Sequence, residues 1–261
     1  MEDPAPAADR TESRPRKRPD QRAQSKRLLD ARARLKTALV TGAGRGIGFA
    51  TANTLAAAGL HVFALDLEFP DQQQKNQIVF DLCDLKGIPA LVESLGAIDV
   101  LVNNAGVQTA VSIERYTEEA RRRILRINLE APVELIRALS KQMIERKSGR
   151  IVNVASVAAF TAHTDLWYGV TKAGVVSFTR SFASYLGPHG IQVNAVAPGP
   201  VETELLRKAQ PERIEQLMRN AYTRRTGRPE EIAEAIRWLA LDAPVVLNGA
   251  VIDVTDGCYL R

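Results

Sequence analysis

The sequence contains few cysteines and no long hydrophobic run. Its 261 residues include only two cysteines, Cys83 and Cys258, which supply neither a disulfide framework nor a cluster of metal ligands. Both are expected to be packing residues in a reducing cytoplasm. No apolar stretch follows the basic N-terminal residues or is long enough to span a bilayer. A secretory signal peptide and a membrane-spanning helix are therefore excluded, and a cytoplasmic protein without a metal site is predicted.

The net charge of +5 is concentrated at the N-terminus. Residues 1–34 contain ten Arg and Lys against six acids, a net charge of +4, which leaves +1 for the remainder. This stretch has almost no apolar residue before Leu28, so it is predicted to be a disordered basic tail. Its run Arg14–Pro19 could contact a polyanion, but a solvated extension or a start site placed too early is the simpler interpretation. Because the rest of the chain is nearly neutral, nucleic-acid binding is not expected.

A glycine-rich loop follows the first predicted strand. The strand Ala38–Thr41 leads into Gly42–Gly48, and an alanine-rich helix, Phe49–Gly59, follows and ends in glycine. Strand, glycine loop and helix together indicate phosphate binding, because N–H groups and the helix dipole at the helix start favour an anion. Ile47 occupies the place of the third glycine in the usual dinucleotide fingerprint, so the pattern is Thr-Gly-x-x-x-Gly-x-Gly. The loop residues expected at the cofactor are Gly42, Arg45, Gly46, Ile47 and Gly48.

The remaining chain alternates predicted strands with longer helices. Further strands are predicted at His61–Asp66, Gln77–Asp81, Asp99–Asn103, Arg150–Ala155, Gln192–Ala197 and Ala250–Val254. Further helices are predicted at Lys86–Leu95, Thr117–Arg146, Trp167–Leu186 and Pro229–Leu241. This alternation implies one α/β domain over residues 35–261, a Rossmann-type doubly wound parallel sheet of about seven strands with helices on both faces. Ligands bind such sheets beyond the carboxyl ends of the strands.

Tyr168 and Lys172 are four residues apart in the predicted helix Trp167–Leu186. Residues at this spacing lie on one helical face, so an ammonium group is expected beside a phenol. The lysine charge is expected to lower the tyrosine pKa from its usual ~10. A phenol of this kind can take a proton from an alcohol or give one to a carbonyl.

Five motifs in order carry a family resemblance: the glycine loop, Asn103–Gly106, Asn128, the group Ser156, Tyr168 and Lys172, and Pro198-Gly199. With them, the chain resembles the classical short-chain dehydrogenases/reductases over about residues 36–257. The resemblance implies an NAD(P)-dependent oxidoreductase that acts on CH–OH groups. Tyr168 would be its general acid/base, Ser156 would orient the substrate oxygen, Lys172 would also bind the nicotinamide ribose, and Asn128 would join a water-linked proton path to the lysine.

The coenzyme preference depends on two residues of opposite charge. Asp66, at the end of the second strand, is expected to accept hydrogen bonds from the ribose of NAD and to repel the 2′-phosphate of NADP. Arg45 could instead pair with that phosphate. In similar proteins the acid usually decides, so NAD is preferred over NADP. By the same resemblance Asp81 and Leu82 would frame the adenine. The remaining cofactor residues would be Asn104, Ala105, Gly106, Tyr168, Lys172, Pro198, Gly199, Val201 and Thr203.

The resemblance also assigns two segments to the substrate. Glu204–Arg225 would fold over it, and the loop Phe160–Trp167 would form another wall. Basic residues in the first segment could favour an acidic substrate, although a solvated helical face is the simpler interpretation; they are Arg207, Lys208, Arg224 and Arg225. His163 in the loop is expected to be polar surface rather than a substrate contact.

Several functions stay open at this point. The leading prediction is hydride transfer between NAD and a secondary alcohol or its ketone. The alternatives are an NADP-dependent 3-oxoacyl-type reductase, a dihydrodiol dehydrogenase and, without catalysis, a nucleotide-sensing regulator, which would not need all four catalytic residues. The resemblance implies a homo-oligomer, a dimer or tetramer, formed through the tyrosine helix. The ending Asp256–Cys258 departs from the usual Asp-Gly-Gly and leaves the packing of the carboxyl end open.

Overall fold

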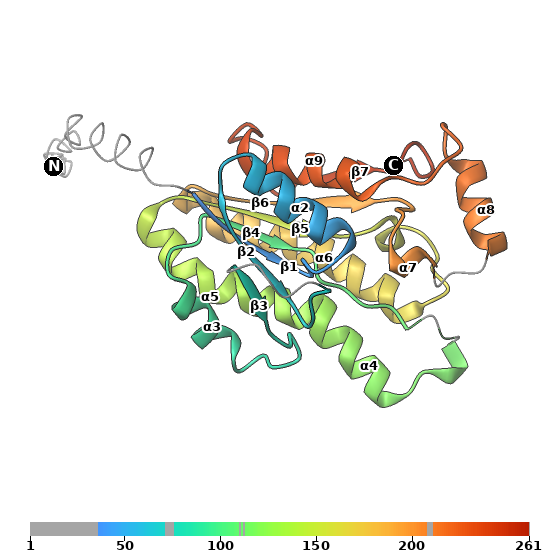
Figure 1. Ribbon diagram of the computed structural model, residues 1–261, viewed down its shortest axis with the longest axis horizontal. Coiled ribbons are helices and arrows are strands. Elements are labelled where there is room, and N and C mark those ends of the chain that lie inside the picture. The colour runs from blue at the N-terminus through green and yellow to red at the C-terminus, as the bar shows by residue number, and fades with distance from the viewer. Residues whose placement is uncertain (1–35, 71–75, 110, 112, 208–210, 261) are drawn as a thin grey trace, which may run out of the picture. The chain divides into compact units, whose positions relative to one another are not determined.

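Seven parallel strands form a single sheet in the computed structural model (Figure 1). The structure describes residues 36–70, 76–109, 111, 113–207 and 211–260, so the predicted N-terminal tail and Lys208 lie outside the described residues. The strands are β1 (Thr37–Thr41), β2 (His61–Asp66), β3 (Gln77–Val79), β4 (Val100–Asn103), β5 (Gly149–Val154), β6 (Ile191–Pro198) and β7 (Val251–Val254). Their order is β3-β2-β1-β4-β5-β6-β7, which confirms the predicted fold class. The order reverses between β1 and β4, and this switch point is where ligands bind in such sheets.

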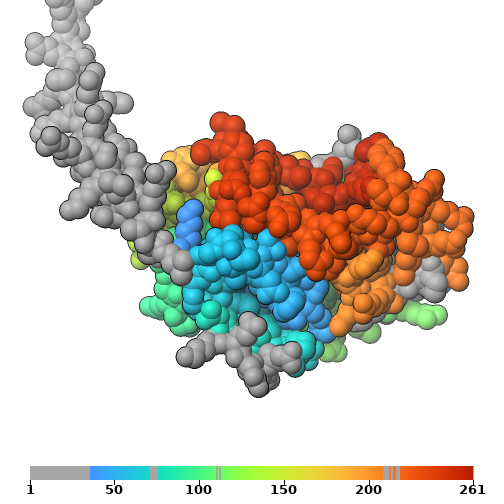
Figure 2. Space-filling model, turned by 45° about the horizontal axis from the view of Figure 1, so that its top comes forward, coloured from blue at the N-terminus to red at the C-terminus, as the bar shows by residue number. Residues whose placement is uncertain are grey.

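Helices cover both faces of the sheet because the strands bury side chains on both faces. Ala38 and Val40 of β1 pack in a core cluster with α2 (Gly46–Ala57) and α9 (Pro229–Leu241). Leu39, between them, points to the opposite cluster with α3 (Ile88–Leu95), α5 (Ala131–Arg146) and α6 (Leu166–Leu186). Each fully buried Leu or Ile contributes about 1.5–3 kcal/mol relative to exposure. Figure 2 shows the blue surface of α2 beside the orange-red surface of α9 on one side of the molecule.

The helix predicted over Thr117–Arg146 is interrupted in its middle. It divides into α4 (Glu118–Leu125), the π-helical turn η2 (Arg126–Glu130) and α5. Pro132, at the start of α5, has no N–H to bond the carbonyl four residues back, at Asn128, and a widened turn accommodates the loss. The prediction of one continuous helix is therefore wrong.

The other boundaries differ by a few residues. α2 begins at Gly46 rather than Phe49, so two glycines of the loop already belong to the helix. β3 ends at Val79, which leaves Asp81 in the turn beyond it. Short elements complete the described chain: η1 (Ile113–Arg115), η3 (Val157–Ala159), η4 (Gly187–His189), α7 (Glu204–Arg207) and α8 (Pro211–Asn220). Among the helices described, none combines the length and the apolarity that a membrane crossing needs.

Candidate active site

The glycine loop folds tightly over the carboxyl end of β1. Gly42 and Gly46 have φ angles of +65° and +55°, which favour glycine. A Cβ on Gly48 would lie 2.0 Å from the Gly42 carbonyl oxygen, and a Cβ on Gly42 would lie 2.8 Å from the Ala105 Cα. No side chain caps the N–H groups at the start of α2. The loop therefore forms a bare backbone surface at a helix N-terminus, and this fits the pyrophosphate of a dinucleotide.

Asn104 and Thr41 fasten this loop to the end of β4. The Asn104 side-chain amide donates to the carbonyl oxygens of Thr41 at 2.9 Å and of Gly42 at 3.1 Å. The Thr41 hydroxyl accepts the N–H groups of Asn104 and Ala105, both at 3.1 Å. Asn104 thus shapes the loop Gly42–Gly48, which is called the glycine cradle below. Ala105 and Gly106 continue the turn toward Lys172.

Asp66 contacts the glycine loop directly. One carboxylate oxygen accepts the Gly44 N–H at 2.7 Å and the other accepts the Leu67 N–H at 2.7 Å. A Cβ on Gly44 would lie 2.9 Å from the Asp66 carboxylate and 2.6 Å from the Glu68 carbonyl oxygen. Gly44 is thus a site residue that the motif analysis missed. Its signal in the sequence was a fourth glycine in the loop, in addition to the three of the motif. Each Asp66 oxygen keeps an accepting position for a ribose hydroxyl.

Arg45 forms ion pairs with two glutamates. Its guanidinium donates to Glu68 and to Glu204, each at 2.8 Å. Glu68 follows β2, and Glu204 is the first residue of α7. The side chain that was expected near a 2′-phosphate is therefore held by carboxylates.

The residues expected around the adenine and the nicotinamide lie at other strand ends. Leu82 is buried, and the Asp81 carboxylate accepts the Cys83 N–H at 2.8 Å. Val201 is buried, and the Thr203 methyl group lies 3.2 Å from the position of a Cβ on Gly46. The segment after β6 therefore contacts the glycine loop, and the two meet where a dinucleotide would cross from one half of the sheet to the other.

The turn Pro198-Gly199 also explains the unusual carboxyl end. Pro198 closes β6, and the Gly199 N–H donates to the Val254 carbonyl at 3.0 Å. The Cys258 sulfur lies 3.0 Å from the position of a Cβ on Gly199. Because Gly199 has no side chain, the Cys258 side chain has room beside this turn.

Tyr168 and Lys172 are buried together on the inner face of α6. They are 8% and 4% exposed, and the Lys172 amine lies 5.6 Å from the centre of the Tyr168 ring. The amine donates to the Val154 carbonyl at the end of β5 at 2.7 Å. The Ser156 hydroxyl accepts the Ala158 N–H at 3.1 Å and interacts with the Tyr168 phenol. The structure brings these three predicted residues to one place.

Asn128 lies beside Gly106, as Lys172 does. Its side chain accepts the Val107 N–H and donates to the Val107 carbonyl, both at 2.8 Å, and donates to the Thr171 hydroxyl at 3.2 Å. The Lys172 amine and the Asn128 carbonyl oxygen lie 3.5 and 3.7 Å from the position of a Cβ on Gly106. Both groups therefore border the space that this glycine leaves open. The water-linked path from Asn128 to Lys172 stays a prediction.

The pKa of Tyr168 differs from the expectation. Burial raises the pKa of the phenol to about 12, while Ser156 acts to lower it and the Asp165 charge raises it further. Burial also lowers the pKa of Lys172 to about 8. The prediction that the lysine draws the tyrosine pKa below ~10 is therefore wrong for the protein alone, because loss of hydration outweighs the neighbouring charge.

A buried carboxylate that the motif analysis missed organises the substrate side. Asp165 is 1% exposed and caps α6 by accepting the Tyr168 N–H at 3.0 Å. It also accepts the N–H and the hydroxyl of Thr109, at 2.7 and 2.8 Å, and the hydroxyl of Tyr116. The signal available in the sequence was an aspartate two positions before the predicted helix Trp167–Leu186. Asp165 joins the segment after β4 to the start of the catalytic helix.

His163 and α7 cover the tyrosine. The His163 ring is half-buried, 5.1 Å from the Tyr168 ring, and its Nδ1 accepts the Asp165 N–H at 3.1 Å. His163 therefore packs on the site rather than lying at the open surface. Leu205 of α7 packs against the Tyr168 cluster, and the Gln108 side chain donates to the Leu205 carbonyl at 3.0 Å. The start of the segment predicted to fold over the substrate lies at Tyr168.

Two of the basic residues of that segment, Arg224 and Arg225, have contacts outside the tyrosine cluster. Arg225 pairs with Glu231 of α9 at 2.6 Å, and the Arg224 guanidinium donates to the Arg219 carbonyl. These contacts fit the simpler of the two interpretations, a set of residues on a solvated face. Lys208 lies outside the described residues.

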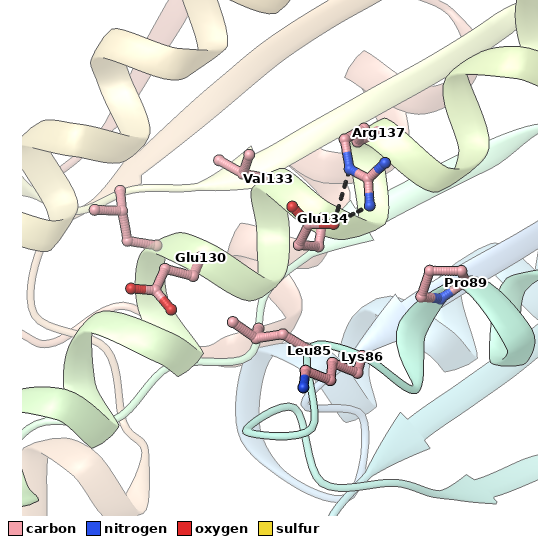
Figure 3. A pocket seen from close by; sticks show the side chains of 8 residues that line it. Leu85, Lys86, Pro89, Glu130, Val133, Glu134 and Arg137 are labelled. Carbon is pink, nitrogen blue, oxygen red and sulfur yellow. Dashed lines mark hydrogen bonds and ion pairs between the residues drawn. The ribbon is translucent and has the colours of Figure 1, made fainter.

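A cavity of about 570 Å³ lies elsewhere, between the start of α3 and the start of α5 (Figure 3). Leu85 and Pro89 line it on one side and Val133 on the other, with the ion pair of Arg137 and Glu134 at its edge. None of the predicted site residues lines it. Within the described parts of the chain, no three His, Cys, Asp or Glu side chains are placed to hold a metal ion.

A dinucleotide cradle at the switch point of a parallel sheet, next to a buried Tyr–Lys pair, defines an NAD(P)-dependent oxidoreductase that acts on CH–OH or ketone groups. The protein belongs to the short-chain dehydrogenase family, whose model matches residues 36–214. It is 36% identical to the 3-oxoacyl-[acyl-carrier-protein] reductase of Synechocystis over 244 residues, 86% of this chain and 97% of the relative.

Solved structures show the same fold. A protein described as an NAD(P)-dependent gluconate 5-dehydrogenase from Beutenbergia cavernae, with bound NADP, has a TM-score of 0.80 and 35% identity. The match covers 85% of this chain and 96% of that one. A 4-hydroxyisoleucine dehydrogenase complexed with NADH has a TM-score of 0.79 and 26% identity, covering 85% and 98% of the two chains. The structures that this chain resembles thus hold either coenzyme.

Proposed function

We propose that this protein transfers a hydride between NAD and a secondary alcohol or its ketone, with Tyr168 as general acid/base. The observation that carries the proposal is the burial of Tyr168 and Lys172, with Ser156 beside the phenol, at the carboxyl ends of β4 and β5 next to the glycine cradle. Bound nicotinamide supplies the hydride acceptor or donor. The residues of the chain supply position, a proton and protection from water.

The pKa values favour proton donation by Tyr168. With a pKa of about 12, the phenol is neutral at pH 7, whereas Lys172, with a pKa of about 8, still carries its charge. A neutral phenol can give its proton to a ketone oxygen held by the Ser156 hydroxyl, and the lysine charge then stabilises the tyrosinate that remains. Reduction therefore needs no prior ionisation of Tyr168. Oxidation requires that the phenol first lose its proton.

Asp66 supports NAD as the coenzyme. Its carboxylate faces the glycine loop through the Gly44 N–H, where a ribose hydroxyl would find an acceptor and a 2′-phosphate would meet a like charge. The test is a titration of the purified protein with NADH and with NADPH, followed by nicotinamide fluorescence. We expect tighter binding of NADH. Preference for NADPH would assign the selection to Arg45, and binding of neither would contradict the cofactor assignment.

A second candidate is a 3-oxoacyl-type reductase that uses NADP. The similarity to the Synechocystis reductase favours it, and the neutral Tyr168 phenol suits a reduction. A panel of short 3-oxoesters and simple ketones, assayed with both reduced coenzymes, separates the two candidates. Turnover of oxoesters with NADPH would support the second, and turnover of other ketones with NADH would support the first.

The homo-oligomer and the cytoplasmic location stay predictions. Leu166 and Val170 of α6 are exposed apolar residues on the tyrosine helix, which supports pairing of two chains along this helix. Light scattering coupled to size exclusion tests it, with Val170→Glu expected to lower the oligomeric mass. An unchanged mass for this variant would contradict pairing through α6.

A further inference from the structure

Arg45 joins three segments of the chain that are far apart in sequence. It precedes α2 in the glycine loop, Glu68 follows β2, and Glu204 begins α7. One terminal nitrogen of its guanidinium donates to Glu204 and the other donates to Glu68, both at 2.8 Å. Each terminal nitrogen, which could otherwise bind a phosphate, therefore donates a hydrogen bond to a carboxylate.

The charges around this guanidinium are predominantly negative. Glu68, Glu204 and Asp66 all act on Arg45, so three carboxylates surround a single cation. Asp66 is close to this group through the loop, because its carboxylate accepts the N–H of Gly44, the residue before Arg45. A phosphate that approached Arg45 would meet a cation whose charge two carboxylates already offset, with the Asp66 carboxylate nearby.

We propose that Glu68 and Glu204 determine which coenzyme this site accepts, by engaging the guanidinium of Arg45 that would otherwise be available to a ribose 2′-phosphate. The inference rests on the proposed function, because it concerns the selection of a nicotinamide coenzyme at the same site. The choice between NAD and NADP then depends on three acidic residues. Asp66 accepts hydrogen bonds from the ribose, and the two glutamates pair with Arg45, the one basic residue of the glycine loop.

The expected size of the effect is moderate because the network is partly exposed. The side chain of Arg45 is 50% exposed, and those of Glu68 and Glu204 are 70% and 54% exposed. A single ion pair of this exposure contributes little free energy, so replacing one glutamate should change the NADPH affinity only slightly. Both glutamates must be replaced to leave Arg45 without an ion pair to either of them. Because exposed charges are screened by salt, the selection should weaken as ionic strength rises.

The experiment measures dissociation constants for NADH and NADPH by nicotinamide fluorescence, without substrate. The variants are Glu68→Gln, Glu204→Gln, the double variant, and the double variant with Arg45→Gln. The double variant should bind NADPH about tenfold more tightly, with NADH affinity changed by less than about twofold. Adding Arg45→Gln should remove the gain for NADPH, because the double-mutant cycle then lacks the released cation.

A matched control comes from α4. The Glu118 side chain is 54% exposed, like that of Glu204, and is bonded to Arg121 and Arg122 away from the glycine loop. Glu118→Gln should leave both dissociation constants unchanged. A similar gain in NADPH affinity in this control would mean that net charge alone is responsible, and would overturn the proposal.

Three further outcomes separate the two proposals. An unchanged preference in the double variant of a parent that binds coenzyme overturns the selector role and leaves the proposed function in place. A gain in NADPH affinity that survives Arg45→Gln also overturns the selector role, since the glutamates would then act by repulsion alone. Failure of the parent to bind either coenzyme overturns the proposed function and the selector role together.

Discussion

The coenzyme side and the substrate side of this site are built in different ways. The part of the coenzyme side that fits the pyrophosphate consists of backbone: glycines that leave no room for a Cβ, strand-end turns, and the N–H groups at the start of α2. The substrate side consists of side chains that link separate segments, with the buried Asp165 at its centre. A short sequence motif is enough to specify a local backbone conformation. Hydrogen bonds between side chains of distant segments depend on how the chain folds, so no short motif predicts them.

The largest effect is expected where the two sides meet, at Tyr168. Tyr168→Phe removes the only proton donor proposed for the reaction and should lower kcat about a thousandfold. The ring still fills its buried place, so NADH affinity should change by less than about twofold. Steady-state rates with the best ketone of the panel and a coenzyme titration check both parts. A rate near that of the parent would show that the proton comes from elsewhere.

A methyl group in the glycine loop should damage the coenzyme side alone. Gly48→Ala places a Cβ 2.0 Å from the Gly42 carbonyl, so the loop must move, and coenzyme affinity should fall more than about tenfold. Gly59→Ala is the matched control, because Gly59 has a φ of +86° and no atom within 4 Å of a Cβ. It should cost about 1 kcal/mol of stability through strain while coenzyme affinity is kept. Equal losses of affinity in both variants would contradict a local role for Gly48.

The same division explains which parts could be predicted from the sequence. The seven strands follow from the hydrophobic pattern, and the glycine loop and the Tyr–Lys pair follow from residue spacing, which are local properties. The Asn-Ala-Gly and Pro-Gly motifs are assigned by the family resemblance. The pairing of Arg45 with Glu204 joins residues 159 positions apart, and that of Asp165 with Thr109 joins residues 56 apart. Neither could be predicted without the fold. The prediction of a lowered Tyr168 pKa was wrong for a related reason. Burial, which raises this pKa, depends on all the segments that pack around the phenol.

Asp165→Asn tests the substrate side. The new side chain keeps only one accepting oxygen, and its NH₂ group replaces the other carboxylate oxygen. Depending on the orientation of the amide, either the two Thr109 donors or the Tyr168 N–H and the Tyr116 hydroxyl lose their acceptor. We expect a loss of about 2 kcal/mol in the free energy of unfolding and a higher KM for the ketone. Coenzyme affinity should stay within about twofold of the parent, because Thr41 and Asn104 hold the glycine loop, whereas Asp165 bonds to the start of the catalytic helix.

Thr109→Val is a milder change to the same contact and tests whether the effect of Asp165→Asn comes from it. Thr109→Val removes one hydroxyl and keeps the N–H, so it should give a smaller shift in the same direction in both stability and KM. Thermal or urea unfolding and steady-state kinetics measure the two quantities. If Asp165→Asn weakened NADH binding as much as it raised KM, the two sides of the site would not be separate units.

The smallest effect concerns pH. The pKa of Lys172 is lowered by burial to about 8 from 10.5, so between these values the unfolded chain binds more protons than the folded chain. Stability therefore rises with pH across this window.

Lys172→Met lacks the titrating group, so the parent should gain about 1–2 kcal/mol of stability relative to this variant between pH 8 and pH 10. Because the Tyr168 pKa is raised from 10.0 to about 12, its opposite effect on stability begins near pH 10, at the upper end of this window, and both proteins share it. Urea unfolding of both proteins at several pH values measures the difference. Parallel pH curves would show that the Lys172 amine is hydrated in the folded protein, and the neutral Tyr168 inferred from burial of the same pocket would then have to be revised.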